Sequence, residues 1–266
     1  MRGGILLNKA EQLKKNLAAG KVCLGTHCWT QDLDFYEMCG WIGYDYIWID
    51  NEHGGMSWPM IKNAIIAANA GGCSAIVRVQ DHETAHIKPV IEAGPDGIIF
   101  PMVNTPEEAK KCVDACMYPP KGKRGFGPGR AIDYGLKPMD EYLETIDDCL
   151  FKIVQCESAE AVRNLDKICK VPGVDAVICG PMDLSGSVGK LGEFFDPEVK
   201  ALMRTIALTC KAHGKPFGVS VGYAPELIEF WKDLGASFLS MGNPQDYFRI
   251  MSQQMLERFR VNQIKK

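Results

Sequence analysis

The chain has 266 residues, of which 46% are hydrophobic and 24% are charged, and its formal net charge is −3. This length suits one large hydrophobic core or two small ones. The near-neutral charge excludes the electrostatic footprint of a protein that binds nucleic acid or an anionic membrane surface. No apolar stretch approaches the roughly 20 residues that span a bilayer, and residues 1–9 lack the pattern of a signal peptide. We therefore expect a cytoplasmic protein with neither nucleic acid nor a membrane as partner.

The eleven cysteines do not indicate a disulfide scaffold. Their number is odd, the chain is long, and most of them fall within predicted strands and helices, where reduced and buried thiols are expected. Cys112 and Cys116 share one helix face, but no second pair at the spacing of a zinc finger accompanies them. We interpret both as packing residues.

Short, β-rich apolar runs alternate with segments of helical period along the whole chain. The predicted strands cover residues 22–27, 44–50, 74–79, 97–103, 151–157, 175–180, 216–221 and 238–242. The predicted helices cover residues 32–39, 59–70, 84–92, 106–117, 159–170, 197–213, 225–234 and 245–260. Eight strand–helix units in about 250 residues predict a parallel sheet that closes into a (β/α)₈ TIM barrel. We expect residues 1–266 to form this single domain.

The segment Ile49-Asp-Asn-Glu-His53 places two acids and a histidine at the end of a buried strand. An ordinary polar loop is the alternative interpretation, since loops are polar whether or not they are functional. In a TIM barrel, however, the carboxyl ends of the strands carry the active site. We therefore expect Asp50 and His53 to belong to a catalytic cluster.

Other strand exits carry chemistry-bearing side chains at the same face of the predicted barrel. Arg78 ends an apolar run and needs an anion there. Glu157 and Asp183 follow adjacent strands and supply two oxygen ligands, which favours Mg²⁺ or Mn²⁺ over a closed zinc site. Alternatively, either acid is a surface carboxylate, and Asp183 could cap the helix that follows. Co²⁺ and Zn²⁺ are less favoured metals for such a site.

A site of this composition suits a small α-keto acid, whose keto oxygen and carboxylate can chelate a metal that acidifies the neighbouring C–H. Arg78 would stabilise the enolate oxygen, and backbone N–H groups of the turn at residues 180–183 would bind the carboxylate. His53 would act as general base, with Asp50 orienting its imidazole. No lysine ends a core strand, so a Schiff base is not predicted.

His82-Glu83-Thr84-Ala85-His86 matches the H-E-x-x-H pattern of zinc proteases. Its context argues against that function, because Asp81 is placed to cap the helix, Pro89 interrupts it, and no third ligand follows. A solvated helix start is the alternative that we favour.

The segment 118–130 is too rich in glycine and proline to be helical, and long ordered loops of this kind are usually functional, although a flexible insertion is an equal alternative. Lys123, Arg124 or Arg130 could supply a cation for the far carboxylate of a long substrate. Simple solvent exposure of these three side chains would explain them equally well.

Several motifs, in order and at barrel spacing, are shared with one family. They are Ile49-Asp-Asn-Glu-His-Gly54, Val77-Arg-Val79, Pro101-Met-Val103, Tyr118-Pro-Pro120 with Arg124-Gly125, Gln155-Cys-Glu-Ser158, and Gly180-Pro-Met-Asp-Leu-Ser185 with Gly189. Through them the chain resembles, over nearly its whole length, the HpcH/HpaI aldolases, which are metal-dependent class II pyruvate aldolases.

The resemblance implies reversible retro-aldol cleavage of a 4-hydroxy-2-oxo acid to pyruvate and an aldehyde, in pathways such as the catabolism of aromatic compounds. It implies metal binding by Glu157 and Asp183, a role for Arg78 at the enolate, an acid/base pair of Asp50 and His53, and substrate contact by Gln155. Gly180, Pro181 and Met182 belong to the turn that we expect at the substrate carboxylate. The resemblance also implies a homo-oligomer, a hexamer or trimer of dimers, in which residues 245–260 form an exchanged helix.

Two departures from the family pattern concern the aldehyde side of the site. Ser220 stands where relatives more often carry a bulky apolar residue, so it would border a roomier or more polar substrate pocket. Asn243 stands where the family tends to carry an acid. Two alternatives to the aldolase stay open: a metal-dependent oxaloacetate decarboxylase or related lyase using a pyruvate enolate, and a non-catalytic ligand-binding barrel.

Overall fold

The computed structural model describes residues 9–264, in which eight parallel strands close into a barrel in the order of the sequence. The strands are β1 Cys23–Cys28, β2 Tyr46–Asp50, β3 Ser74–Arg78, β4 Gly97–Phe100, β5 Phe151–Cys156, β6 Ala176–Cys179, β7 Phe217–Val221 and β8 Phe238–Met241. The predicted (β/α)₈ TIM barrel is confirmed, and every predicted strand overlaps an observed one. Among the helices of the described residues, none combines the length and hydropathy needed to cross a membrane.

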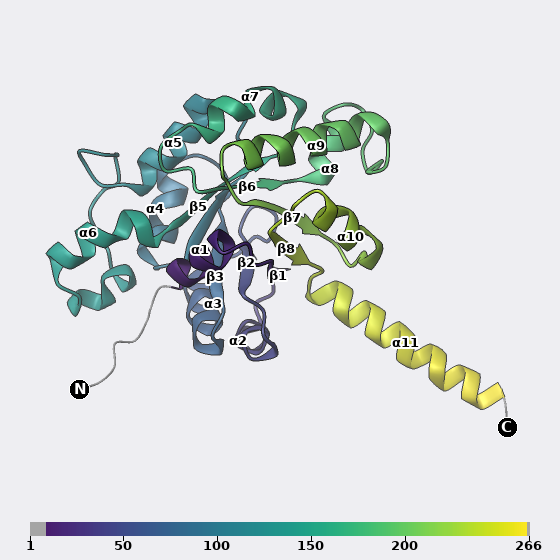
Figure 1. Cartoon of the computed structure of the whole chain (residues 1–266). Coiled ribbons are helices and arrows are strands. Elements are labelled where there is room, and N and C mark those ends of the chain that lie inside the picture. The colour runs from purple at the N-terminus through teal and green to yellow at the C-terminus, as the bar shows by residue number, and fades with distance from the viewer. Residues whose placement is uncertain (1–8, 265–266) are drawn as a thin grey trace.

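Most of the helices surround the barrel on its outer side (Figure 1). The helices of the described residues are α1 Ala10–Ala18, α2 Leu33–Ile42, α3 Trp58–Gly71, α4 Thr84–Glu92, α5 Pro106–Cys116, α6 Met139–Cys149, α7 Ala159–Cys169, α8 Pro181–Gly186, α9 Pro197–Ala212, α10 Pro225–Asp233 and α11 Pro244–Ile264, with a 3₁₀ segment η1 at Arg130–Gly135. Local signals start several of them. Thr105 and Glu108 form a capping box before α5, and Asp196 caps α9.

Strand alternation decides which side chains enter the barrel. On β2, Ile47 and Ile49 pack outward in the cluster that includes helix residues, whereas Tyr46 and Trp48 lie in the separate cluster inside the barrel. Because side chains alternate along a strand, Asp50 also points inward, one layer nearer the carboxyl end. The apolar interior therefore ends in a polar layer at that end of the barrel.

Glycines make room for the large side chains of the interior. A Cβ at Gly25 of β1 would lie 2.5 Å from the ring of Tyr46, and one at Gly218 of β7 would collide with the ring of Phe238. Real Cβ atoms do not approach other atoms so closely, so these two strands need glycine to let aromatic rings fill the barrel.

Helices α1, α6 and the short α8 were not predicted. In α1, Ala10, Leu13 and Leu17 are buried at helical spacing, so a periodic signal was present near the start of the chain. In α6, Tyr142 is the one buried residue. Met139, Leu143 and Ile146 recur with Tyr142 at helical spacing, so a periodic signal was present there as well.

The 118–130 segment lies at the amino end of the strands, because it leads from α5 into the connection that precedes β5. Arg130 donates to the carbonyl oxygens of Ala93 and Gly94, just before β4, at 3.1 and 2.8 Å. The suggestion that this loop binds the far carboxylate of a substrate is therefore wrong for a substrate bound at the strand exits of its own barrel. The loop and the strand exits lie at opposite ends of one barrel.

Helix α11 extends away from the barrel (Figure 1). Tyr247 anchors its first turn, since its hydroxyl lies 2.9 Å from Thr26 Oγ1 and 3.1 Å from the Tyr44 hydroxyl. Beyond that turn, α11 carries large apolar side chains that are more than half exposed, at Phe248, Met251, Met255, Leu256 and Phe259.

Candidate functional site

The carboxyl end of the barrel gathers the inward side chains that end four strands. His27, Asp50 and Arg78 come from three consecutive strands, and Gln155 comes from β5. Asp50 and Arg78 are cross-strand partners in the β2–β3 register. Because their side chains point to the same side of the sheet, the two charged groups meet inside the barrel.

Asp50 and Arg78 form a buried bidentate ion pair. The Arg78 Nε donates to Asp50 Oδ1 at 2.9 Å and Nη2 donates to Oδ2 at 2.7 Å, a geometry that only the planar guanidinium offers. Burial opposes charge on both groups, but the contacts with His27 and Arg78 outweigh it at Asp50, and the carboxylates of Asp50 and Glu52 outweigh it at Arg78. The pKa of Asp50 is therefore held well below its usual value, and that of Arg78 is raised.

The predicted pairing of Asp50 with the His53 imidazole is not formed. Asp50 Oδ1 instead accepts hydrogen bonds from the backbone N–H groups of Glu52, at 2.9 Å, and His53, at 3.4 Å. The backbone folds over the carboxylate, so the His53 side chain is turned outward, 72% exposed, with Nε2 3.7 Å from Glu52 Oε2. The side chains that do contact the Asp50 carboxylate are Arg78 and His27. The catalytic role of His53 stays a prediction.

His27 is a site residue that the sequence analysis missed. Its Nε2 lies 3.1 Å from Asp50 Oδ2, and its ring packs between Trp29 and Trp48, with centroids 5.1 and 4.9 Å away. The signal was available, because Cys23, Gly25 and His27 alternate on β1, but the polar residue at the end of that strand was not considered.

Glu157 is buried at the end of β5 and is held from two sides. Its Oε1 accepts the backbone N–H of Met102 at 2.6 Å, and its Oε2 accepts a short hydrogen bond from the Gln155 side-chain amide. Met102 adopts a left-handed backbone with φ of 50°, a conformation that strains a residue with a side chain. Burial, together with the charges of Glu52 and Asp183, raises the pKa of Glu157 to about 7, although the Met102 N–H and Arg78 act to lower it.

Asp183 lies in the first turn of the short helix α8 and is exposed. The interpretation of Asp183 as a helix cap is wrong, because Gly180 is the N-cap residue and α8 has no side-chain cap hydrogen bond. Gly180 must remain small, because a Cβ there would lie 2.8 Å from the Cβ of Glu157. Pro181, the next residue, is buried, whereas the Met182 side chain is half exposed at the carboxyl end of the barrel.

The two departures from the family pattern occupy different environments. Ser220 is a half-buried residue of β7, in register with the buried Ser240 of β8. The Asn243 amide donates to Asp246 Oδ2 at 2.8 Å, and its oxygen accepts the Asp246 N–H at 3.0 Å. The Asn243 side chain is therefore bonded to Asp246 in the first turn of α11.

The donor set of the site fits a divalent cation. The carboxylates of Glu52, Glu157 and Asp183 act electrostatically on one another. One of them, Glu52, also forms an ion pair with Arg78, with Oε2 2.7 Å from Nη1. Adding Asp50, four carboxylates face one guanidinium, and a divalent cation would offset the excess. Within residues 9–264 no three His, Cys, Asp or Glu side chains cluster as ligands, so water or substrate oxygens would complete the coordination, as is usual for Mg²⁺.

The H-E-x-x-H segment does not form a metal site. Helix α4 begins at Thr84, so His82 precedes it and does not share a helix face with His86. The His82 Nε2 contacts the carbonyl oxygen of Pro101 at 2.6 Å, whereas His86 Nδ1 contacts the Asp81 carboxylate at 2.9 Å. The two imidazoles have separate local partners, in agreement with the interpretation as a helix start.

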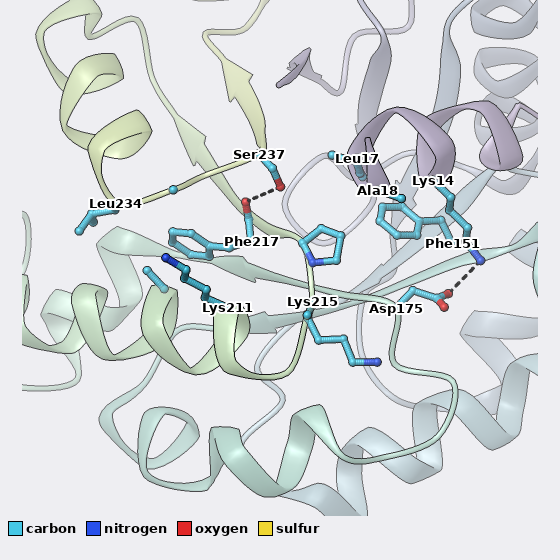
Figure 2. A pocket seen from close by; sticks show the side chains of 14 residues that line it. Lys14, Leu17, Ala18, Phe151, Asp175, Lys211, Lys215, Phe217, Leu234 and Ser237 are labelled. Atoms are coloured by element: carbon cyan, nitrogen blue, oxygen red, sulfur yellow. Dashed lines mark hydrogen bonds and ion pairs between the residues drawn. The ribbon is translucent and has the colours of Figure 1, made fainter. Parts of the chain in front are cut away.

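A hollow of about 570 Å³ opens at the other end of the barrel (Figure 2). Its lysines have local partners: Lys14 Nζ lies 3.3 Å from Asp175 Oδ2, and Lys215 Nζ donates to the carbonyl oxygen of Val174 at 2.6 Å. It is lined by residues at the amino ends of β5 and β7, and none of the residues predicted for the site reaches it. We therefore place the functional site at the carboxyl end despite the size of this hollow.

Replacing Asp50 by Asn should destabilise the fold by about 3 kcal/mol or more at pH 7, because the buried Arg78 charge loses its bidentate carboxylate and keeps only the contact with Glu52. Asp50 has a lowered pKa, so its contribution is complete above the ordinary pKa of 3.8 and is lost as the pH falls through the folded-state pKa. Urea unfolding of both proteins should show a constant difference down to about pH 4 and a narrowing difference below. Asp34→Asn on exposed α2 is the control, and equal stability of wild type and Asp50→Asn at pH 7 would contradict the assignment.

Comparison with known proteins agrees with this geometry. Residues 28–243 match the model of the HpcH/HpaI aldolase/citrate lyase family. The chain is 36% identical to a hydroxypyruvate/pyruvate aldolase of Roseobacter denitrificans, over 86% of this chain and 89% of the relative, and 38% identical to a 4-hydroxy-2-oxovalerate aldolase of Novosphingobium aromaticivorans, over 86% and 87%. The crystal structure of a family protein from Burkholderia cenocepacia superposes with a TM-score of 0.89 at 27% identity, covering 94% of this chain and 99% of that one. The family resemblance seen in the sequence is thereby confirmed: the chain belongs to the HpcH/HpaI aldolase/citrate lyase family.

Proposed function

We propose that this chain, as a single barrel domain, is a divalent-metal-dependent class II pyruvate aldolase that reversibly cleaves a 4-hydroxy-2-oxo acid to pyruvate and an aldehyde. The observation that carries the proposal is a buried guanidinium, held by Asp50, beside the carboxylates of Glu157 and Asp183. This combination suits a substrate that is both anionic and metal-chelating. The aldolase names of two relatives more than 35% identical support the reaction class.

Glu157 and Asp183 would hold the cation, with Mg²⁺ or Mn²⁺ favoured by their oxygen ligands and Co²⁺ or Zn²⁺ possible replacements. When bound, the metal would polarise the keto group of the substrate and so favour enolate formation. The Gln155 side-chain amide donates a hydrogen bond to Glu157, and Gln155 would also contact the substrate. The turn of Gly180, Pro181 and Met182 would border the substrate carboxylate.

In cleavage, His53 would accept the proton of the C4 hydroxyl, and the C4 oxygen would become the aldehyde oxygen. The electron pair of the C3–C4 bond would pass to C2 and its oxygen, forming the enolate of pyruvate. Arg78 is already fixed by Asp50, so its positive charge would stabilise this oxygen without reorganisation. Protonation at C3 would then release pyruvate. The exposed His53 side chain is free to rotate toward the mouth.

Chelator-treated protein should release pyruvate from 4-hydroxy-2-oxo acids only after Mg²⁺ or Mn²⁺ is restored. Glu157→Gln and Asp183→Asn should both abolish this rescue and weaken Mn²⁺ binding measured by calorimetry, with Glu198→Gln on exposed α9 as control. Metal-dependent turnover of oxaloacetate alone would point to a decarboxylase instead. Metal binding without any turnover would leave a non-catalytic barrel.

Arg78→Ala should reduce kcat/KM for pyruvate release by about 10²–10³, the cost of removing one preorganised stabiliser of an oxyanion. Arg204→Ala, on the exposed side of α9, should leave it unchanged. Steady-state kinetics with a coupled pyruvate assay measures both. A loss of less than about tenfold in the folded Arg78→Ala protein would remove Arg78 from the proposed role.

We also propose that the chain forms a homo-oligomer in the cytoplasm, in which α11 packs on another copy. Phe248, Met251, Met255 and Phe259 recur at helical spacing and are more than half exposed on a helix that leaves its own barrel. Such a stripe would be covered in a stable assembly. The eleven free cysteines, ten of them buried, suit a reducing compartment.

Size-exclusion chromatography with light scattering should find an oligomer, a hexamer or trimer of dimers if the family resemblance extends to assembly. In the double variant Phe248→Asp and Met255→Asp, the protein should elute as a smaller species, because assembly would bury two charges in each copy of the interface helix. The exposed Gln254→Asp substitution on the same helix is the matched control. A monomeric wild type would refute the proposal.

A further inference from the structure

His27 lies on the acceptor side of the proposed site. Arg78, Gln155 and Glu157, which would hold the pyruvate half, lie on and just after β3 and β5. His27 and Ser220 come from β1 and β7, the two strands that flank β8 in the closed barrel. The aldehyde half of a substrate, which extends away from the pyruvate half, would therefore face these two polar side chains.

The contact with Asp50 sets the orientation of the imidazole. Nε2 is fully buried and lies 3.1 Å from Asp50 Oδ2, although the ring is not aligned for a linear hydrogen bond. A ring nitrogen so close to a carboxylate carries the proton, because a lone pair there would be repelled. In the neutral ring, Nδ1 is therefore the hydrogen-bond acceptor.

Nδ1 is available to a ligand. It has no hydrogen-bond partner within the part of the chain that the structure describes, and it is not among the buried unpartnered atoms, unlike Nε2. The side chain keeps 18% of its surface exposed. The rings of Trp29 and Trp48 pack against the imidazole and fix its position. Nδ1 is therefore a polar atom held in place beside two aromatic rings.

The surroundings keep the ring neutral near pH 7. Burial lowers the pKa of His27, and the charges of Arg78 and His53 lower it further, while the Asp50 carboxylate opposes them. A neutral imidazole presents a lone pair at Nδ1, which matches the hydrogen of an alcohol and has no match in an alkyl group.

We propose that His27 is a specificity-determining residue that accepts a hydrogen bond from the hydroxyl group of a short hydroxyaldehyde, so that the acceptor of this enzyme is a hydroxylated aldehyde and not an alkyl aldehyde. The inference rests on the proposed aldolase function. Ser220 adds a second hydroxyl-binding group on the same side. An alkyl aldehyde would cover Nδ1 without satisfying it, and a binding site penalises an analogue that leaves a polar group unpaired.

Glycolaldehyde and propanal test the proposal, because they have nearly the same size and differ by a hydroxyl in place of a methyl group. The kcat/KM for condensation with pyruvate is measured for both aldehydes, with Mn²⁺, in wild type, His27→Phe, His27→Gln and the control His213→Phe, which lies at the end of α9. Because the aldehydes differ in intrinsic reactivity, the change of their ratio between variants is the readout.

His27→Phe should lose about 10- to 100-fold on glycolaldehyde and little on propanal, whereas His27→Gln, which keeps an acceptor, should retain part of the preference. An unchanged ratio in a folded His27→Phe protein would overturn the inference. If His27→Phe does not fold, an unchanged ratio in a variant pair of His27→Gln and His27→Leu would do so.

Deuterium exchange at C3 of pyruvate, followed by NMR in D₂O, separates the two proposals. Exchange needs only the donor half of the site, so His27→Phe should lose much less of the exchange rate than of its kcat/KM on glycolaldehyde. No exchange in wild type would refute the aldolase itself. Exchange that is lost in folded His27→Phe would assign His27 to the donor half and overturn the acceptor role.

Discussion

The buried ion pair of Asp50 and Arg78 is the constraint on which the rest of the site depends. An unpaired guanidinium inside the barrel would be strongly destabilising, and the β2–β3 register supplies its partner. Once Asp50 holds Arg78, its remaining oxygen lone pairs bind the backbone of the following turn and approach His27. One carboxylate thus positions a cation, a turn and an imidazole.

The second determinant is an excess of negative charge at the same end of the barrel. Glu52, Glu157 and Asp183 act on one another across the strand exits. Burial is the main cause that raises the pKa of Glu157 to about 7, and the charges of Glu52 and Asp183 add to it. Hydrogen bonds from Met102 and Gln155 hold Glu157 in place nevertheless. Such an arrangement costs stability in the unliganded protein and favours binding of a cation, which is how a site exchanges stability for function.

Much of the fold was predictable because its signals are local. Buried parallel strands are short apolar runs, and eight of them separated by helical segments have few other arrangements than a closed barrel. Helix α6 was missed although Met139, Tyr142, Leu143 and Ile146 recur at helical spacing, because it is one helix more than the strand–helix alternation requires between β4 and β5. The H-E-x-x-H match was misleading, because a pattern of residue types does not establish that His82 lies on the helix that carries His86.

The sequence by itself determined which residue types end each strand, because alternation along β2, β3 and β5 follows from the residues of those strands. Hence the positions of Asp50, Arg78, Gln155 and Glu157 at one end of the barrel were predictable. Only the tertiary structure decided their partners: Asp50 faces Arg78 and His27 instead of the His53 imidazole, and the 118–130 segment lies at the opposite end. The physical reason is that pairing depends on strand register and on which end of the barrel a connection closes, and both are set by packing between segments distant in sequence.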